Sequence, residues 1–257
     1  MKVLAIGDVV GNSGCEFLRK KLPEVKQKYN IDLVIANGEN SAEGNGITPY
    51  SADFLLNSGV DVITTGNHCF RRREMYKKYD DCFNIIRPAN FPTSFSPGTG
   101  VCVLDMLKYQ VVIINIMGTV FMEPIDSPFK VIDKILKSQP KDSIIIVDFH
   151  AEATSEKRAM GFYLNGRVSA IFGTHTHIPT ADACILRGGT GYITDVGMTG
   201  VIESNLGVKP EIIIKKLTTK MPVRFEYASG ECKMDIVILD IDEKSRKTTD
   251  IKRLTVI

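Results

Sequence analysis

The four histidines of this chain are grouped in a way that suggests a shared metal site. His68, His150, His175 and His177 are the only histidines among 257 residues, and each comes shortly after an apolar run. A random distribution would also put histidines in helices or in the long C-terminal part. Imidazole is the commonest neutral nitrogen ligand of transition metals. His175 and His177 are two residues apart, so their rings can converge on neighbouring positions.

Oxygen ligands occur in the same kind of position. Carboxylate or amide side chains follow three of the apolar runs, as Asp8, Glu39, Asn40 and Asn67. A set of nitrogen and oxygen donors without thiolate suits Mn, Fe, Ni or Zn better than Ca. The residue types therefore predict a transition-metal site.

The apolar runs that precede these residues are short and rich in β-branched side chains, which is typical of strands covered on both faces. They are residues 3–6, 33–36, 60–64, 111–116, 144–149 and 168–173, and helical spacing lies between several of them, at 16–28, 49–58, 127–138 and 152–164. This alternation predicts an α/β layered fold. Ligands of open α/β sheets bind beyond the carboxyl ends of the strands, so the candidate ligands are expected on one rim.

The last third of the chain has a different pattern. Hairpin-like pieces occur at residues 183–186, 192–194, 223–227, 233–241 and 248–257. We expect them to be antiparallel strands that contribute to a second sheet. The whole of 1–257 is expected to form a single domain.

Each motif alone also has an ordinary structural explanation. Asp8 can end a strand, Asn37-Gly38 is a hairpin-turn signal, Asn67 can cap a turn, and His150 can be a hydrogen-bonded core histidine. The glycines of residues 7–14 suggest a phosphate loop, but the Gly-Lys-Ser/Thr ending and the G-x-G-x-x-G spacing are absent. The recurrence of ligand-type residues after five separate runs favours the metal site.

The order of the motifs resembles the calcineurin-like metallophosphoesterases. The motifs are Gly7-Asp8, Gly38-Glu39-Asn40, Gly66-Asn67-His68, His150 and Gly173-Thr174-His175-Thr176-His177. Residues 37–48 and 194–200 are similar to the YmdB-like branch, and the similarity runs over nearly the whole chain. The resemblance implies a four-layer β-sandwich flanked by helices, with a dinuclear metal site at the carboxyl ends of the strands.

The resemblance also assigns the ligands. It implies that Asp8, Glu39, Asn40 and His177 hold one metal, and that Glu39, Asn67, His150 and His175 hold the other. Glu39 then bridges the two ions, which in the family are iron or manganese. His68 is the acid near the leaving group, and the sequence identifies no substrate-binding residue.

Two departures from the wider superfamily concern these ligands. Val10 stands where the D-x-H opening has its histidine, and Glu39 replaces the usual bridging aspartate. In the YmdB-like branch, Asn40 takes the place of the lost histidine. An amide oxygen is a weaker donor than imidazole, so this exchange bears on metal identity and affinity.

The function that the resemblance implies is hydrolysis of small phosphodiesters, above all 2′,3′-cyclic nucleotides such as 2′,3′-cAMP, together with an influence on gene expression. Two cations about 3.5–4 Å apart can hold a bridging hydroxide. This hydroxide attacks phosphorus while His68 protonates the leaving oxygen.

Two other functions stay open. One is a metal-containing regulatory protein that binds RNA or a partner and has little catalysis. Arg71-Arg72-Arg73 can support such binding, can attract phosphate at the mouth of an active site, or can form a solvated face. The other is a nuclease or phosphoprotein phosphatase.

The composition of the chain limits the kinds of partner that we expect it to bind. The formal net charge of +2 does not indicate a nucleic-acid coat or a membrane surface. No apolar stretch approaches the roughly 20 residues that span a bilayer, and the first residues do not resemble a signal peptide. Six scattered cysteines without a C-x-x-C pair indicate reduced thiols. We therefore expect a cytoplasmic protein that acts on a small substrate, and leave a homo-oligomer open.

Overall fold

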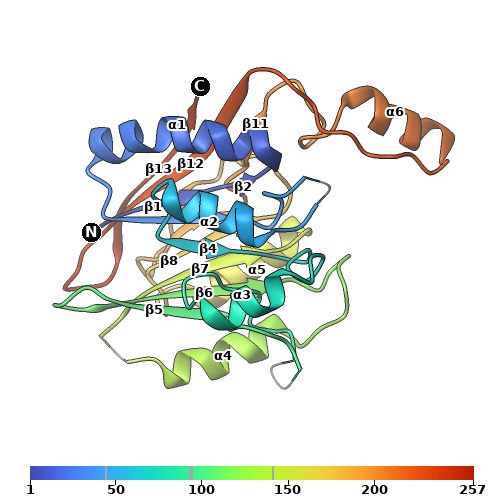
Figure 1. Cartoon of the computed structure of the whole chain (residues 1–257). Coiled ribbons are helices and arrows are strands. Elements are labelled where there is room, and N and C mark those ends of the chain that lie inside the picture. The colour runs from blue at the N-terminus through green and yellow to red at the C-terminus, as the bar shows by residue number, and fades with distance from the viewer. Residues whose placement is uncertain (44, 93–94, 141) are drawn as a thin grey trace.

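The computed structural model describes residues 1–43, 45–92, 95–140 and 142–257. Within this part of the chain, seven strands form one sheet, six strands form another, and there are six helices (Figure 1). The mixed α/β class predicted from the sequence is confirmed.

The first sheet combines both ends of the chain. Its strands are β1 (Lys2–Ile6), β2 (Asp8–Val9), β3 (Leu33–Asn37), β4 (Val62–Thr64), β11 (Met198–Val201), β12 (Cys232–Ile241) and β13 (Thr248–Val256). They are ordered β2-β11-β12-β1-β3-β4, with β13 also paired to β12. Since β1, β3 and β4 are parallel, their carboxyl ends lie at the same edge.

The second sheet comes from the middle of the chain. Its strands are β5 (Val101–Asp105), β6 (Gln110–Met117), β7 (Ile144–His150), β8 (Ala170–Thr174), β9 (Cys184–Ile185) and β10 (Gly191–Ile193). They are ordered β5-β6-β7-β8-β10-β9. β6, β7, β8 and β10 are parallel, so β7 and β8 also present their carboxyl ends together.

Five of the six helices cover the outer faces of the two sheets. The helices are α1 (Gly11–Tyr29), α2 (Pro49–Asn57), α3 (Met75–Asp81), α4 (Pro128–Ser138), α5 (Thr154–Leu164) and α6 (Pro210–Thr219). Buried side chains of α1, α2 and α3 pack on the first sheet, and those of α4 and α5 pack on the second. α6 stands away from both sheets (Figure 1).

The two sheets pack against each other through a third apolar cluster. Alternate residues of β1 explain this layering, because side chains of a strand point to opposite faces. Leu4 and Ile6 belong to the cluster shared with the helices, whereas Val3 and Ala5 belong to the cluster between the sheets. Helices therefore flank a pair of sheets, in four layers.

The C-terminal strands correct one expectation. β11, β12 and β13 complete the first sheet, and only β9 and β10 join the second. β12 lies beside β1 and is buried on both faces, with Ile236 toward the helices and Val237 toward the other sheet. Its nearly continuous apolar run is typical of such a central strand.

Local boundaries differ in two further places. Residues 223–227 are not a strand, because only Tyr227 forms a bridge there, with Val208. α1 begins at Gly11, so part of the glycine-rich stretch is its first turn. A Cβ atom on Gly14 would lie 2.4 Å from the carbonyl oxygen of Thr199, and only glycine allows this close packing of α1 on β11.

No helix in the described ranges is long and apolar enough to cross a membrane. All six cysteines are free thiols, and Cys15, Cys69 and Cys102 are buried.

Candidate metal centre

The structure brings all eight predicted site residues together. They lie at or just after the ends of β1, β3 and β4 of the first sheet and β7 and β8 of the second, and a continuous set of short contacts joins their side chains: Asp8, Glu39, Asn40, Asn67, His68, His150, His175 and His177. The common rim expected from the strand ends is therefore present. Gly44, within the segment 37–48 that resembles the YmdB-like branch, lies outside the described residues.

His150, the last residue of β7, is the centre of one group of donors. Its Nε2 atom lies 3.3 Å from Glu39 Oε1, 3.0 Å from Asn67 Oδ1 and 3.1 Å from His175 Nδ1. The ligand atoms of Glu39, His150 and His175 all lie within 4.8 Å of one another. These four donors form the set that the resemblance implies for one metal.

A second group of donors surrounds His177. Its Nε2 atom lies 3.6 Å from Asp8 Oδ1 and 3.3 Å from Asn40 Nδ2, and Asn40 Nδ2 also lies 3.1 Å from Glu39 Oε1. Asp8 is fully buried, yet its Oδ1 atom has no hydrogen-bond partner among the described residues. A buried carboxylate oxygen without a partner is costly, and a cation between it and His177 removes this cost. The donors present thus fit a metal here as well.

A hydrogen-bonded chain behind His150 fixes which nitrogen faces the centre. Thr174 Oγ1 donates to Asp148 Oδ1 at 2.7 Å, so its oxygen is an acceptor for His150 Nδ1 at 2.9 Å. With the proton on Nδ1, the Nε2 lone pair is free for a metal. Asn37 ends β3, and its amide nitrogen lies 3.2 Å from Asp148 Oδ2, which makes it part of this support rather than of a hairpin turn.

His175 is oriented by a carboxylate in the same way. Its Nε2 atom lies 3.0 Å from Glu152 Oε2, whereas its Nδ1 atom faces His150. Its backbone nitrogen donates to Asp8 Oδ2 at 3.0 Å. The loop after β8 therefore connects the two groups of donors.

The backbone of that loop is strained and is held by a buried ion pair. His175 has φ 99° and His177 has φ 63°, values that side-chain-bearing residues rarely adopt. Lys157 Nζ donates to the carbonyl oxygen of Thr174 at 2.7 Å and to Asp195 Oδ2 at 2.6 Å. Both charged side chains are only 1% exposed.

Asp195 also accepts from the backbone nitrogen of Thr176 at 3.2 Å. Sequence reasoning missed the roles of Lys157 and Asp195, although Asp195 lies in the segment 194–200 that resembles the YmdB-like branch. A lysine inside a helical pattern carries no local sign of burial.

The centre leaves no room for a side chain at position 66. A Cβ atom on Gly66 would lie 2.1 Å from His150 Nε2 and 2.4 Å from Glu39 Oε2. Glycine at this position thus lets the loop after β4 approach the ligands closely enough to present Asn67.

The charged groups at the centre strongly shift one another's pKa values. Burial raises the pKa of Glu39, but His150 and His68 outweigh burial and hold the pKa well below its usual value. Burial lowers the pKa of His150, yet Glu39 and Asp8 raise it to about 9. Burial and the neighbouring His150 lower the pKa of His175 to about 3. Such opposite shifts within one cluster are typical of functional sites.

His68 lies at the edge of the cluster rather than inside it. Its Nδ1 atom lies 3.1 Å from Glu39 Oε1 and 3.1 Å from Asn40 Oδ1, and its backbone nitrogen donates to Glu39 Oε2 at 3.0 Å. The side chain is 20% exposed. The second ring nitrogen, Nε2, is thus available to a bound molecule.

A cleft of about 980 Å³ opens over the centre. One side is lined by Glu39, Asn40, His68, His175 and His177, and the other by residues between Asn205 and Tyr227 around α6. The lining does not include the arginine cluster: Arg71 and Arg73 are exposed, and Arg72 donates from Nε to the carbonyl oxygen of Asn45 at 3.0 Å.

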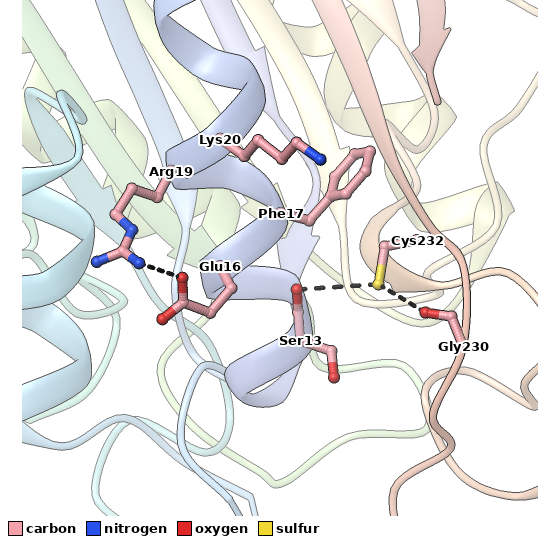
Figure 2. A pocket seen from close by; sticks show the side chains of 7 residues that line it. All are labelled: Ser13, Glu16, Phe17, Arg19, Lys20, Gly230 and Cys232. Carbon is pink, nitrogen blue, oxygen red and sulfur yellow. Dashed lines mark hydrogen bonds and ion pairs between the residues drawn. The ribbon is translucent and has the colours of Figure 1, made fainter.

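A second hollow, of about 540 Å³, lies beside α1, and Figure 2 shows its lining. Glu16 pairs with Arg19 there, and Cys232 Sγ lies 3.6 Å from the carbonyl oxygen of Gly230 (Figure 2). None of the four histidines lines it. This hollow is therefore separate from the candidate metal centre.

Comparison with known proteins agrees with the motifs. A family model described as YmdB-like protein matches residues 4–254. The chain belongs to this family. A relative of this YmdB-like chain, from Bacillus subtilis (strain 168), is 44% identical over 257 residues, which is 100% of this chain and 97% of the relative. Its name is 2′,3′-cyclic-nucleotide 2′-phosphodiesterase.

Solved structures extend the comparison. A Mycoplasma pneumoniae protein described as a novel phosphatase superposes with a TM-score of 0.95 at 35% identity, over 100% of the YmdB-like chain and 93% of its own. The NAD nucleotidase of Haemophilus influenzae shares the fold alone, with a TM-score of 0.57 at 15% identity over 99% of this chain and 55% of that one. The predicted enzyme class, a hydrolase acting on phosphodiester bonds, is confirmed.

Proposed function

We propose that this YmdB-like chain is a dinuclear metal-dependent phosphodiesterase that hydrolyses small phosphodiesters, chiefly 2′,3′-cyclic nucleotides such as 2′,3′-cAMP. The observation that supports it most is the convergence of two donor groups on one shared carboxylate, that of Glu39. The name of the Bacillus subtilis relative supports the substrate class. The proposal treats residues 1–257 as a single calcineurin-like domain.

Two transition metals, iron or manganese, are proposed at this site. Asp8, Glu39, Asn40 and His177 would hold one, and Glu39, Asn67, His150 and His175 would hold the other. As placed, Asn40 turns Nδ2 toward His177 and Oδ1 toward His68. A rotation of the amide about its last bond exchanges the two atoms and presents the oxygen as a ligand.

When bound, the metals supply an activated water and neutralise the anionic oxygens of the phosphodiester. The leaving sugar oxygen then needs a proton, since an alkoxide is a poor leaving group. His68 can provide it from Nε2, because Nδ1 is held by Glu39 Oε1 at 3.1 Å. Strain in a five-membered cyclic phosphate favours this substrate over a linear diester.

The experiment that tests the proposal is metal analysis combined with turnover of 2′,3′-cyclic, 3′,5′-cyclic and linear phosphodiesters, with Mn or Fe loaded anaerobically. We expect two metals per chain and the highest kcat/KM for the 2′,3′-cyclic compounds. A fully loaded protein that hydrolyses no member of the panel would contradict the proposal. It would favour the alternative of a metal-containing regulatory protein that binds RNA or a partner.

Two broader predictions accompany the enzyme. The cytoplasm remains the predicted compartment. A role in the regulation of gene expression, which the family resemblance implies, remains a prediction that turnover measurements alone do not address.

A further inference from the structure

The second side of the cleft is formed by residues 205–227, which we call the arm. The arm leaves and rejoins the body through a hydrogen-bonded neck, in which Val208 bridges both Asn205 and Tyr227. The backbone nitrogen of Ala228 also donates to the carbonyl oxygen of Gly207 at 2.9 Å. Beyond this neck, α6 has no buried residue and projects from the body (Figure 1).

The part of the arm that lines the cleft is mostly apolar but carries two positive charges. The apolar residues are Leu206, Val208, Ile213, Met221, Pro222, Val223, Phe225 and Tyr227, and the charged ones are Lys216 and Lys220. Large apolar side chains exposed together are unusual on a soluble surface and mark binding sites. Because Glu39, His68 and His175 line the same cavity, a molecule that is bound at the rim and is long enough to span the cavity contacts the arm.

One aromatic ring on the arm is half-exposed and contacts a lysine side chain. Phe225 is 53% exposed, and Lys216 Nζ lies 4.8 Å from the centroid of its ring. This cation–π contact places a positive charge over one face of the ring, and the ring stays half-exposed. A flat aromatic surface next to an ammonium group is complementary to a base attached to an anionic phosphate.

We infer that Phe225 and Lys216 form a subsite that stacks on the nucleobase of the substrate while its phosphate lies at the metal centre. The inference rests on the proposed function and adds a specificity-determining residue to it. It makes the preferred substrates nucleoside phosphodiesters, rather than sugar or alkyl phosphodiesters with the same reacting group. Stacking of a base on an aromatic side chain is worth about a tenfold to hundredfold change in binding.

The test compares two substrates that differ only in the base: 2′,3′-cAMP and methyl ribofuranoside 2,3-cyclic phosphate. Phe225→Ala should lower kcat/KM for 2′,3′-cAMP by about tenfold to a hundredfold and change the value for the baseless compound by less than about twofold. Phe225→Trp should restore turnover of 2′,3′-cAMP. Leu217→Ala is the matched control, because Leu217 lies on α6 next to Lys216 and is 60% exposed but does not line the cleft.

Equal losses on both substrates would overturn the inference, and so would unchanged turnover of 2′,3′-cAMP. A direct binding measurement distinguishes the absence of the subsite from failure of the proposed function. If the wild-type protein hydrolyses neither compound, calorimetric binding of adenosine 3′-monophosphate still decides about the subsite. Weaker binding in Phe225→Ala than in wild type and Leu217→Ala supports it, and equal binding in all three refutes it.

Discussion

The metal centre and the arm form opposite sides of one cleft but are built in opposite ways. Asp8, Glu39 and His150 are at most 1% exposed, and each lies at or just after the end of a parallel strand. On the arm, α6 has no buried residue, and Leu217 and Phe225 are more than half exposed. One side is part of the core, whereas the other joins the core through its neck.

The difference in burial follows from the groups that each side has to bind. Buried charges are stable only when other charges or hydrogen bonds compensate them, so the candidate ligands need supporting contacts such as those of Thr174, Asp148 and the Lys157–Asp195 pair. A surface that stacks on a base needs only an apolar ring and a nearby charge. The comparison therefore predicts large effects of substitutions in the metal centre and progressively smaller effects away from it.

The largest effect is expected for Glu39→Ala. The carboxylate is shared by both donor groups, so its removal should deplete both metals and lower kcat/KM by about 10⁴-fold or more. Elemental analysis and turnover check this, with Glu39→Gln to separate loss of charge from loss of volume. A Glu39→Ala protein that still carries two metals per chain would contradict the assignment.

His68→Ala should have the next largest effect, and it should leave the metals in place. General-acid catalysis is typically worth about 10²–10⁴-fold, and that loss should appear in kcat for a nucleoside leaving group. The loss should be smaller for a p-nitrophenyl diester, whose leaving group needs little protonation. Loss of metal in this variant would make His68 a ligand, and equal losses on both substrates would make it a phosphate-positioning residue.

Lys157→Met tests the support behind the ligands. Breaking a buried ion pair typically lowers the free energy of unfolding by about 3–5 kcal/mol. Loss of the bond to the Thr174 carbonyl oxygen should also weaken metal binding by about 10–100-fold, as other changes behind metal ligands do. Urea unfolding and metal titration measure the two effects.

A double variant separates these two effects of the Lys157–Asp195 pair. Lys157→Met with Asp195→Leu removes the unpaired charge, so it should recover much of the stability while metal binding stays weak. Unchanged metal affinity in the single variant Lys157→Met would show that the pair does not orient the loop after β8.

The smallest effect is expected when Arg71 and Arg73 are both replaced by alanine. They are exposed and do not line the cleft, so kcat should be unchanged and KM should stay within about twofold. Kinetics at low and high salt check this result. A rise in KM at low salt that disappears at high salt would mean that the two arginines attract substrate, and would extend the active site beyond the cleft.

Much of the metal centre could be predicted from the sequence because its signal is local. An apolar run followed at once by Asp8, by Glu39-Asn40 or by His150 reports both the strand and the residue at its end. Parallel strands bring such ends to one rim whatever their order in the sheet. The eight residues chosen from residue types, spacing and the family motifs are therefore brought together by the fold, and their roles as ligands and acid stay predictions.

The support of the metal centre depends on pairs that no local pattern contains. Lys157 meets Asp195 38 residues away, and Asn37 meets Asp148 111 residues away. The placement of β12 beside β1 joins the two ends of the chain, and the pattern of β12 alone did not say which sheet it would enter.

The arm is likewise a product of the tertiary structure. The arm is placed beside the candidate ligands by the pairing of Val208 with Tyr227 in its neck, and these two residues also line the cleft. Periodicity records whether a side chain is buried, but it does not record which distant residue the side chain meets. The sequence by itself thus indicated the candidate ligands and the class of chemistry, and only the fold decided what holds these side chains in place and what faces them across the cleft.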